Sequence, residues 1–554
     1  MEFKRISELL DVVSQTTKRT EKISLVSSFL RELPKSEVKP AALFLGGRIF
    51  AESEGLTLNL SWKGLLDSLH SIIEFKDGDL NSLYEGDAGE AIAALLASKG
   101  YSRQEILFQE PLTISGVKQE FSRIASMKGK GSLKEKQLGI SRLLSEASPR
   151  EARYLTALVL NDMRTGLSEG LLAESIAEAF SVDANLVRRA WSFSGDIGEI
   201  ARVASDGGKS ALESVTIKVM TAVKPMLANP LDDISEALKL GVQSYELKLD
   251  GARVQIHKDG KSIRIYSRQL NDMTDSLPDI VELVEREVKV KRVVLDGEVV
   301  AVDSMGKPYP FQIVMRRFGR TRDIEEVNQE ISLKLFIFDI LLLEDEMLVD
   351  LPYKDRREKL REIIPTEMIV DNLISNSETE IRQFFKKSQE EGHEGLVVKR
   401  LDSPYVPGSR GKLWFKLKHT LDTLDLVIIA AEWGHGRRSK WLSDFHLAVR
   451  NEETNEFIMI GKTFKGLTDD EFQQITEMLL EIARTKKRGT VFVNPEIVVE
   501  VLASEIQESP TYESGYALRF ARIKRIRDDK SPKDATTLEE LKRMYESQFK
   551  FKAR

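Results

Sequence analysis

The sequence has 554 residues, 41% of them hydrophobic and 31% charged, and its 88 acidic residues outnumber 82 Lys and Arg, giving a net charge of −6. A chain of this length exceeds one hydrophobic core, so we expect about three or four domains. Cysteine is absent, which excludes disulfides, thiolate zinc sites and cysteine nucleophiles and suits a reducing compartment.

The N-terminal stretch mixes its apolar residues with charges, so it lacks the apolar core of a signal peptide. No run elsewhere approaches the roughly 20 apolar residues that a membrane span requires. We therefore expect a cytoplasmic protein, associated with the nucleoid if the source is prokaryotic.

Residues 1–214 predict an all-α domain. Apolar residues recur at spacings of three and four in ISELLDVV and EAIAALLASKG. The stretch SMKGKGSLKEKQ (126–137) interrupts this pattern with two glycines and four lysines, and we expect a basic loop there.

Residues 215–421 predict an α+β domain, which follows the proline-punctuated connector VKPMLANP. ARVQIHKDGKSIRIYSR alternates apolar residues on both sides of Asp259-Gly260 and predicts a hairpin with a two-residue turn at that pair. VVLDGEVVAVD, LKLFIFDILLL and EGLVVKRL predict further strands, and DRREKLREII and TEIRQFFKKSQEEG predict helices.

Residues 422–554 predict a small β-barrel of the oligonucleotide-binding (OB) type, because short apolar strands are broken by Gly and Asn turns. A charged helix, TTLEELKRMYESQFKFKAR, closes the chain. Residues 515–554 hold twelve basic and six acidic residues, so this end is locally basic despite the negative total.

Charged residues recur at the ends of short apolar strands in the central domain, and Glu298 is expected to end the strand of LDGE. Lys248 is one, and a nucleophilic lysine needs a site that removes its proton, since its ordinary pKa is about 10.4. Glu298 and Glu394 could hold Mg²⁺, while Lys416 and Lys418 project from one strand face and could bind phosphate. Each charge alone is typical of a solvent-facing strand end; together they indicate a phosphoryl-transfer site.

Seven motifs follow one another in order: KLDG (248–251) with Arg253, SRQ with Arg268, LDGE (295–298), FIFD with Phe338, EGLVVK (394–399), WFKLK (414–418) and LRFARIKRIRDDK (518–530). This series resembles that of the nucleotidyltransferases in the ATP-dependent DNA ligase family. KGKGS and DMRTGLSEGLL, with Arg164 and Gly166, resemble the helical DNA-binding domain of the archaeal and eukaryotic replicative members.

The resemblance implies an enzyme that seals nicks in duplex DNA during replication, repair and recombination. Lys248 would take AMP from ATP and pass it to the 5′-phosphate of the nick. The 3′-hydroxyl would then attack that adenylated phosphate. It implies metal binding (Mg²⁺, or Mn²⁺) by Glu298 and Glu394, with Asp250 assisting. The nucleotide-binding residues that it implies are Glu246 and Phe338 at the adenine, Arg253 at the ribose, and Arg268, Glu298, Arg410, Lys416 and Lys418 nearby.

For DNA, the resemblance implies contacts from Arg164, Gly166 and Arg268, a three-domain monomer able to encircle a nicked duplex, and a sliding clamp as a partner by analogy alone. The last motif would orient pyrophosphate with Arg519, Arg522, Asp528 and Lys530. Ala521 departs from the proline that is common in the family, which could loosen the local backbone.

The sequence also fits two other functions. An RNA ligase or mRNA-capping guanylyltransferase shares the KxDG lysine, although the long helical region and the arginine-rich last motif favour a DNA ligase. A DNA-binding scaffold without activity is the second, and the intact Lys248, Glu298, Glu394, Lys416 and Lys418 argue against it. Absence of cysteine argues against the NAD-dependent ligases, which ordinarily carry a cysteine zinc module.

Overall fold

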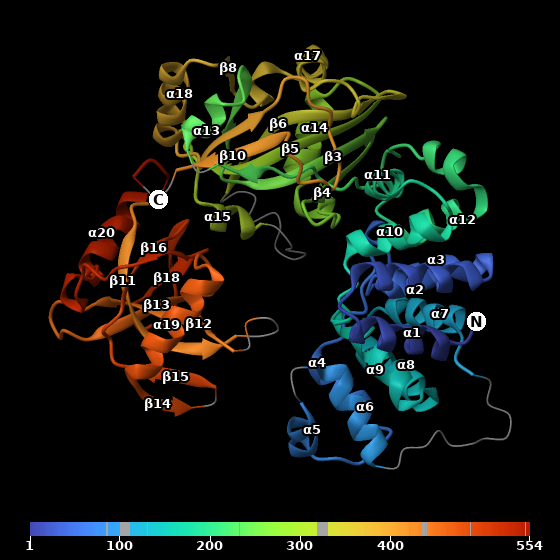
Figure 1. The fold of residues 1–554 in the computed structure, drawn as a ribbon. Coiled ribbons are helices and arrows are strands. Elements are labelled where there is room, and N and C mark those ends of the chain that lie inside the picture. The colour runs from blue at the N-terminus through green and yellow to red at the C-terminus, as the bar shows by residue number, and fades with distance from the viewer. Residues whose placement is uncertain are drawn as a thin grey trace.

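The computed structural model describes residues 1–554 except 85–86, 100–110, 130, 232, 318–330, 420, 435–437, 439, 488, 549 and 554. A helical domain, an α+β domain and a β-rich domain follow one another along an arc (Figure 1). This confirms the predicted fold class, while the boundaries at 214/215 and 421/422 stay predictions. No described helix is long and apolar enough to cross a membrane.

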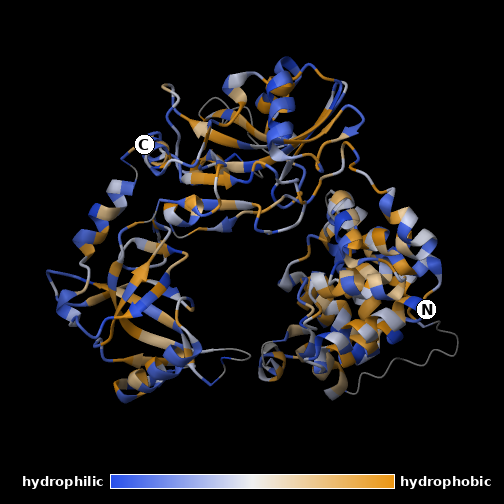
Figure 2. Cartoon of the chain, turned by 45° about the horizontal axis from the view of Figure 1, so that its top comes forward, coloured by the Kyte–Doolittle hydropathy of each residue, from blue (hydrophilic) through white to orange (hydrophobic). Residues whose placement is uncertain are grey.

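The helical domain packs its helices around one large apolar core that includes Phe3, Phe44 and Phe121. Apolar residues concentrate inside it in Figure 2. Its helices are α1 (Phe3–Gln15), α2 (Arg19–Glu32), α3 (Lys35–Leu45), α4 (Trp62–His70), α5 (Asp77–Leu83), α6 (Ala88–Ser98), α7 (Ile114–Ser126), α8 (Ser132–Glu146), α9 (Pro149–Leu160), α10 (Glu169–Ala179), α11 (Ala184–Ser194) and α12 (Ile197–Glu213).

The predicted basic loop is shorter than expected. Helix α8 begins at Ser132, so SLKEKQ is helical and the prediction of a loop over 126–137 is wrong for that half. The physical reason is that Gly131, at φ +91°, ends the loop, while Gly139, Ile140, Leu143 and Leu144 give the following residues a buried helical face.

The central domain contains two five-stranded sheets. The first has the order β1-β10-β9-β2-β8 and the second β4-β3-β5-β6-β7. Strand bounds are β1 (Asn229–Pro230), β2 (Gln243–Lys248), β3 (Ala252–Asp259), β4 (Ser262–Ser267), β5 (Arg292–Val302), β6 (Ser332–Leu343), β7 (Glu346–Met347), β8 (Asn372–Ser375), β9 (Gly395–Lys399) and β10 (Trp414–Lys418). Helices α13 (Ile234–Leu238), α14 (Pro278–Glu287), α15 (Phe311–Met315), α17 (Tyr353–Ile363) and α18 (Glu378–Glu390) lie around them.

Two local predictions in this domain need correction. The hairpin forms, but Asp259 pairs with Ser262, so its turn is Gly260-Lys261 and not Asp259-Gly260; Gly260 takes the φ of +61° that the turn requires. Glu298 lies within β5 rather than at a strand end, because β5 runs on through the apolar residues VVAV as far as Val302.

The β-rich domain has a seven-stranded sheet that curls around an apolar core, with a separate β17–β18 hairpin. Its elements are β11 (Leu424–Trp433), β12 (Leu442–Arg450), β13 (Phe457–Thr463), α19 (Asp469–Glu481), β14 (Ala483–Lys487), β15 (Thr490–Val493), β16 (Val498–Leu502), β17 (Glu505–Glu508), β18 (Tyr516–Arg519), β19 (Arg522–Ile526) and α20 (Leu538–Gln548). Helix α20 returns the chain end to the central domain (Figure 1).

Candidate active site

Lys248 lies where the two sheets of the central domain meet. It is the last residue of β2 in the first sheet, and β3 of the second sheet begins four residues later. The turn requires glycine at 251, because a Cβ there would lie 2.4 Å from the carbonyl oxygen of Val299 in β5. The close approach of the sheets therefore fixes the position of Lys248.

A cavity of about 860 Å³ opens at this junction. It gathers residues from Leu227 to Lys552, from both sheets and from the barrel domain. The predicted site residues that line it are Glu246, Lys248, Asp250, Arg253, Arg268, Glu298, Phe338, Glu394, Arg410, Lys416, Lys418 and Arg519.

Lys248 is held by a carboxylate shared with a second lysine. Its Nζ lies 2.8 Å from Oε2 of Glu394, and Nζ of Lys418 lies 2.6 Å from the same oxygen. Burial opposes the charge on Lys248, but Glu394 and Glu298 outweigh it and raise its pKa. Burial likewise opposes the charge on Glu394, yet the two lysines lower its pKa to about 2.

The environment of Glu298 shifts its pKa in the opposite direction from that of Glu394. Burial raises its pKa to about 7, and in the described part of the chain no cation lies within ion-pair distance of it. Glu298 and Glu394 repel one another across the cavity. Two carboxylates beside lysines that could bind phosphate fit Mg²⁺, which is commonly held by one or two carboxylates together with substrate phosphates. The described residues contain no cluster of three or more acidic, His or Cys side chains that could hold a metal alone.

Arg253, the cross-strand partner of Glu298 between β3 and β5, is fixed by four contacts. Its guanidinium donates to both oxygens of Asp296, at 3.0 and 2.6 Å, to the carbonyl of Met226 at 2.7 Å and to the Tyr405 hydroxyl at 3.2 Å. The guanidinium also lies 5.4 Å from the ring centroid of Phe338. An arginine held this firmly can present one face to a ligand without first losing side-chain entropy.

The barrel domain completes the cavity wall. Arg519 at the end of β18 lies in the lining and pairs with Glu505 at 3.2 Å. Lys552, after α20, forms an ion pair with Asp250, two residues from Lys248. The site is therefore assembled from two domains rather than one.

Five predicted residues do not line the cavity. Arg164 and Gly166 lie in the loop between α9 and α10, where Arg164 is exposed and pairs with Asp162 at 2.8 Å. Lys530 pairs with Asp425 at 2.6 Å in the barrel, and Arg522 and Asp528 are exposed on it. A nucleotide in the cavity would not touch them in this arrangement.

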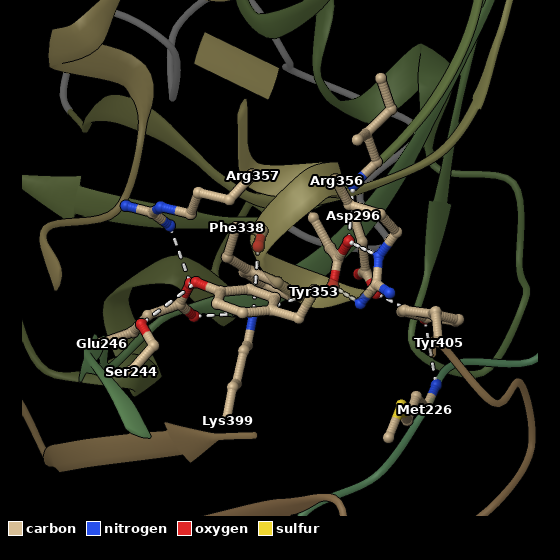
Figure 3. A network of polar contacts seen from close by, with 12 residues as sticks. Met226, Ser244, Glu246, Asp296, Phe338, Tyr353, Arg356, Arg357, Lys399 and Tyr405 are labelled. Carbon is tan, nitrogen blue, oxygen red and sulfur yellow. Dashed lines mark hydrogen bonds and ion pairs between the residues drawn. The ribbon is translucent and has the colours of Figure 1, made fainter. Parts of the chain in front are cut away.

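Several residues that build the site were not predicted. Tyr353 and Arg357 from α17 contact Glu246 (Figure 3), and Asp296 and Tyr405 hold Arg253. Lys399 from β9 also pairs with Glu246; the sequence placed it in the EGLVVK motif but gave it no role at Glu246. One signal was present in the sequence: Tyr353, Arg356 and Arg357 have the helical spacing of one face and so could converge.

Comparison with known proteins gives a match along the whole chain. The model described as "ATP dependent DNA ligase domain" matches residues 225–418, "DNA ligase N terminus" residues 2–177 and "ATP dependent DNA ligase C terminal region" residues 438–530. The "DNA ligase" of Thermococcus onnurineus is 39% identical, covering 100% of this chain and 99% of that protein. "DNA ligase 1" of Korarchaeum cryptofilum is 42% identical over 99% of each chain. The solved structure "Pmar-Lig_Pre." has a TM-score of 0.58 at 16% identity, covers 94% of this chain and 99% of that one, and supports the fold.

Proposed function

This chain belongs to the ATP-dependent DNA ligases, and we propose that Lys248 is the residue that carries AMP when the enzyme seals a nick. Sealing of nicks in DNA at the expense of ATP is the activity of the family. The observation that carries the residue assignment is the cavity in which Lys248 ends a strand among cations suited to phosphates.

In the first step, the Lys248 ammonium, which pairs with Glu394 in this structure, gives a proton to water. The neutral Nζ then attacks the α-phosphorus of ATP and loses a second proton to water as the new bond forms. A P–N bond forms, and the bond from that phosphorus to the bridging oxygen breaks, so that pyrophosphate leaves. Lys416 and Lys418 neutralise the phosphates, and the exposed Arg268 and Arg410 line the same cavity. Such transfers depend on alignment and on neutralising charge more than on covalent chemistry by the protein.

At the nucleoside end, Phe338 stacks on the adenine and Glu246 accepts a hydrogen bond from it, while Arg253 contacts the ribose. Arg519 reaches the cavity from the barrel and orients pyrophosphate. Glu298 and Glu394, with Asp250 nearby, would hold Mg²⁺ or Mn²⁺. When bound, the metal would supply positive charge to the phosphate oxygens.

In the later steps, a 5′-phosphate oxygen at the nick attacks the AMP phosphorus and Lys248 leaves. The 3′-hydroxyl then attacks the 5′-phosphorus and AMP leaves. Arg268 contacts the 5′-phosphate, and Arg164 and Gly166 contact the duplex from the helical domain. Because Arg522, Asp528 and Lys530 lie away from the cavity, the barrel turns before they act. A sliding clamp as partner and a monomeric state rest on family analogy.

The proposal is tested with a labelled nicked duplex supplied with ATP, GTP or NAD one at a time. We expect sealing and an acid-labile protein adduct with ATP, and neither sealing nor adduct with Lys248→Ala, although that variant should still bind the duplex. Sealing by Lys248→Ala would overturn the assignment of the nucleophile, and an adduct with GTP alone would contradict the assignment of ATP.

A further inference from the structure

Glu246 is the centre of a buried network at the nucleoside end of the cavity (Figure 3). Its Oε1 accepts from the Tyr353 hydroxyl at 2.5 Å and from Arg357 at 2.8 Å, and its Oε2 lies 2.7 Å from Nζ of Lys399. Glu246 is 2% exposed and Lys399 1%. Three donors from two elements therefore converge on one carboxylate.

These donors keep Glu246 an acceptor. An ionised carboxylate has about four lone-pair positions and donates nothing, whereas its protonated form would turn an O–H toward a neighbour. All three neighbours, among them the cations Arg357 and Lys399, turn an N–H or O–H toward its oxygens, so Glu246 serves each of them as the acceptor. Three positions are filled, and about one is left for a group in the cavity.

The donors are themselves held in place. Arg357 also donates to the carbonyl of Val370 and to Asn372 at 3.0 Å. Lys399 donates to the carbonyl of Phe338 at 3.0 Å and lies 4.7 Å from the centroid of that ring. Lys399 thus contacts both the Glu246 carboxylate and the Phe338 ring, and so fixes the position of one relative to the other.

We propose that Tyr353, Arg357 and Lys399 are positioning residues that make the site select adenine over guanine. This inference rests on the proposed function, in which Glu246 faces the base. Adenine offers an amino donor at the position where guanine has a carbonyl acceptor. A carboxylate locked as an acceptor binds the first and repels the second, and a buried acceptor left unpaired disfavours guanosine nucleotides.

The test is the rate of self-adenylation by the full-length chain with labelled ATP and with labelled GTP. Tyr353→Phe removes one hydroxyl and keeps the ring. We expect it to raise KM for ATP about tenfold, with kcat changed by less than about twofold, and to lower the ratio of kcat/KM for ATP over GTP by about tenfold, since bonds to charged groups have this size. Lys399→Met should lower the ratio in the same direction.

Tyr154→Phe is the matched control. The Tyr154 hydroxyl donates to Asp11 at 2.6 Å in the helical domain, so the change removes the same kind of bond far from the cavity. It should leave both the ratio and KM unchanged.

An unchanged ratio of kcat/KM for ATP over GTP in Tyr353→Phe, whether or not kcat falls, would overturn the inference. If Lys248 of the unaltered chain still carries the label in that experiment, the proposed function survives the failure. If no label reaches Lys248 from any nucleotide, the proposed function fails instead.

Discussion

The end of the cavity around Glu246 is built from buried charges that are paired. Arg356, from the same helix as Arg357, is fully buried and donates to both oxygens of Asp339, at 2.7 and 3.0 Å. Burial opposes the charge on Asp339, but Arg356 and then Lys399 lower its pKa. A buried pair does not necessarily stabilise the fold, yet breaking one leaves an uncompensated charge.

Asp339→Asn is therefore expected to destabilise the chain by about 3 kcal/mol, because Arg356 keeps its buried charge without a carboxylate. The double change Asp339→Leu with Arg356→Leu should lower the free energy of unfolding by markedly less. Thermal unfolding followed by calorimetry measures both. Asp345→Asn is the control, since its pair with Arg292 has a carboxylate that is 87% exposed. If Asp339→Asn unfolds at the same temperature as the unaltered chain, the pair does not have this role.

The residues that line the cavity were predictable where they stand in strands with a motif around them. Lys416 and Lys418 alternate, so both reach one face, and Lys248 ends its strand as expected. The spacing of Tyr353, Arg356 and Arg357 predicts a shared helical face, but the burial of that face was not predictable, because YKDRREKLREI is so polar that it is typical of an exposed helix. Its buried face is explained by acids from distant strands, Glu246 and Asp339, which helical periodicity cannot reveal.

The connector after the helical domain is held by polar side chains of β3 and β4. Gln255 bonds both the N–H and the carbonyl of Val223, at 2.7 and 3.1 Å, and the Tyr266 hydroxyl donates to the carbonyl of Met220 at 2.6 Å. The alternation in ARVQIHKD predicts that Gln255 and His257 face away from the apolar residues. Both are buried nevertheless, because the connector covers that face, and no local pattern reports such a tertiary contact.

His257 makes this contact sensitive to pH. The Met220 N–H donates to Nδ1 at 3.2 Å, and Nε2 lies 2.8 Å from the Gln255 amide oxygen, an arrangement that needs a neutral ring with its proton on Nε2. Burial lowers the pKa of His257 to about 3. The folded pKa lies below the unfolded value of about 6.5, so stability is fully present above pH 6.5 and is lost as pH falls toward 3.

His257→Gln should therefore show a flatter loss of stability between pH 6.5 and 5. The unaltered chain should lose up to about 1.4 kcal/mol per pH unit more than the variant in that window. Burial also lowers the pKa of His393 and of His419 to about 4. Both chains contain these two histidines, so their contributions to the slope cancel in the comparison. Urea unfolding at several pH values measures the slopes, and parallel slopes would contradict the assignment.

The loop between α9 and α10 presents Arg164 to solvent. Arg164 and Gly166 both have positive φ, +49° and +65°, and the buried Lys22 donates to the Thr165 carbonyl at 2.5 Å. Under the proposed function, Arg164→Ala should weaken binding to a nicked duplex and lower the slope of log K against log salt by about 1. Lys359→Ala, on the exposed side of α17, should not. An unchanged salt slope in Arg164→Ala would place the DNA elsewhere.

At the scale of the whole molecule, the helical and barrel domains stand at the two ends of the arc (Figures 1 and 2). The chain end ties the barrel to the central domain: Lys552 pairs with Asp250, and the Ala553 N–H donates to the Pro308 carbonyl at 2.9 Å. The domain types were predictable from periodicity. This contact was not, because it joins residues about 300 positions apart.

Lys552→Ala is expected to loosen the barrel from the central domain, because Asp250 then has no cation from the chain end. Small-angle X-ray scattering without DNA should give a larger radius of gyration. Adenylation should slow, since Arg519 no longer stays in the cavity, while sealing of a duplex that is already adenylated should not. Lys542→Ala, whose pair with Glu539 is exposed on α20, is the control. Equal radii and equal adenylation rates would contradict a role for the contact.

The assignment on which the rest depends is that AMP is carried by Lys248. Mass spectrometry of peptides from the full-length chain, after incubation with ATP and a divalent cation without DNA, tests it directly. We expect the mass of one AMP on the peptide that contains Lys248 and its loss when nicked DNA is added. AMP on another residue, or AMP on Lys248 that nicked DNA does not remove, would contradict it.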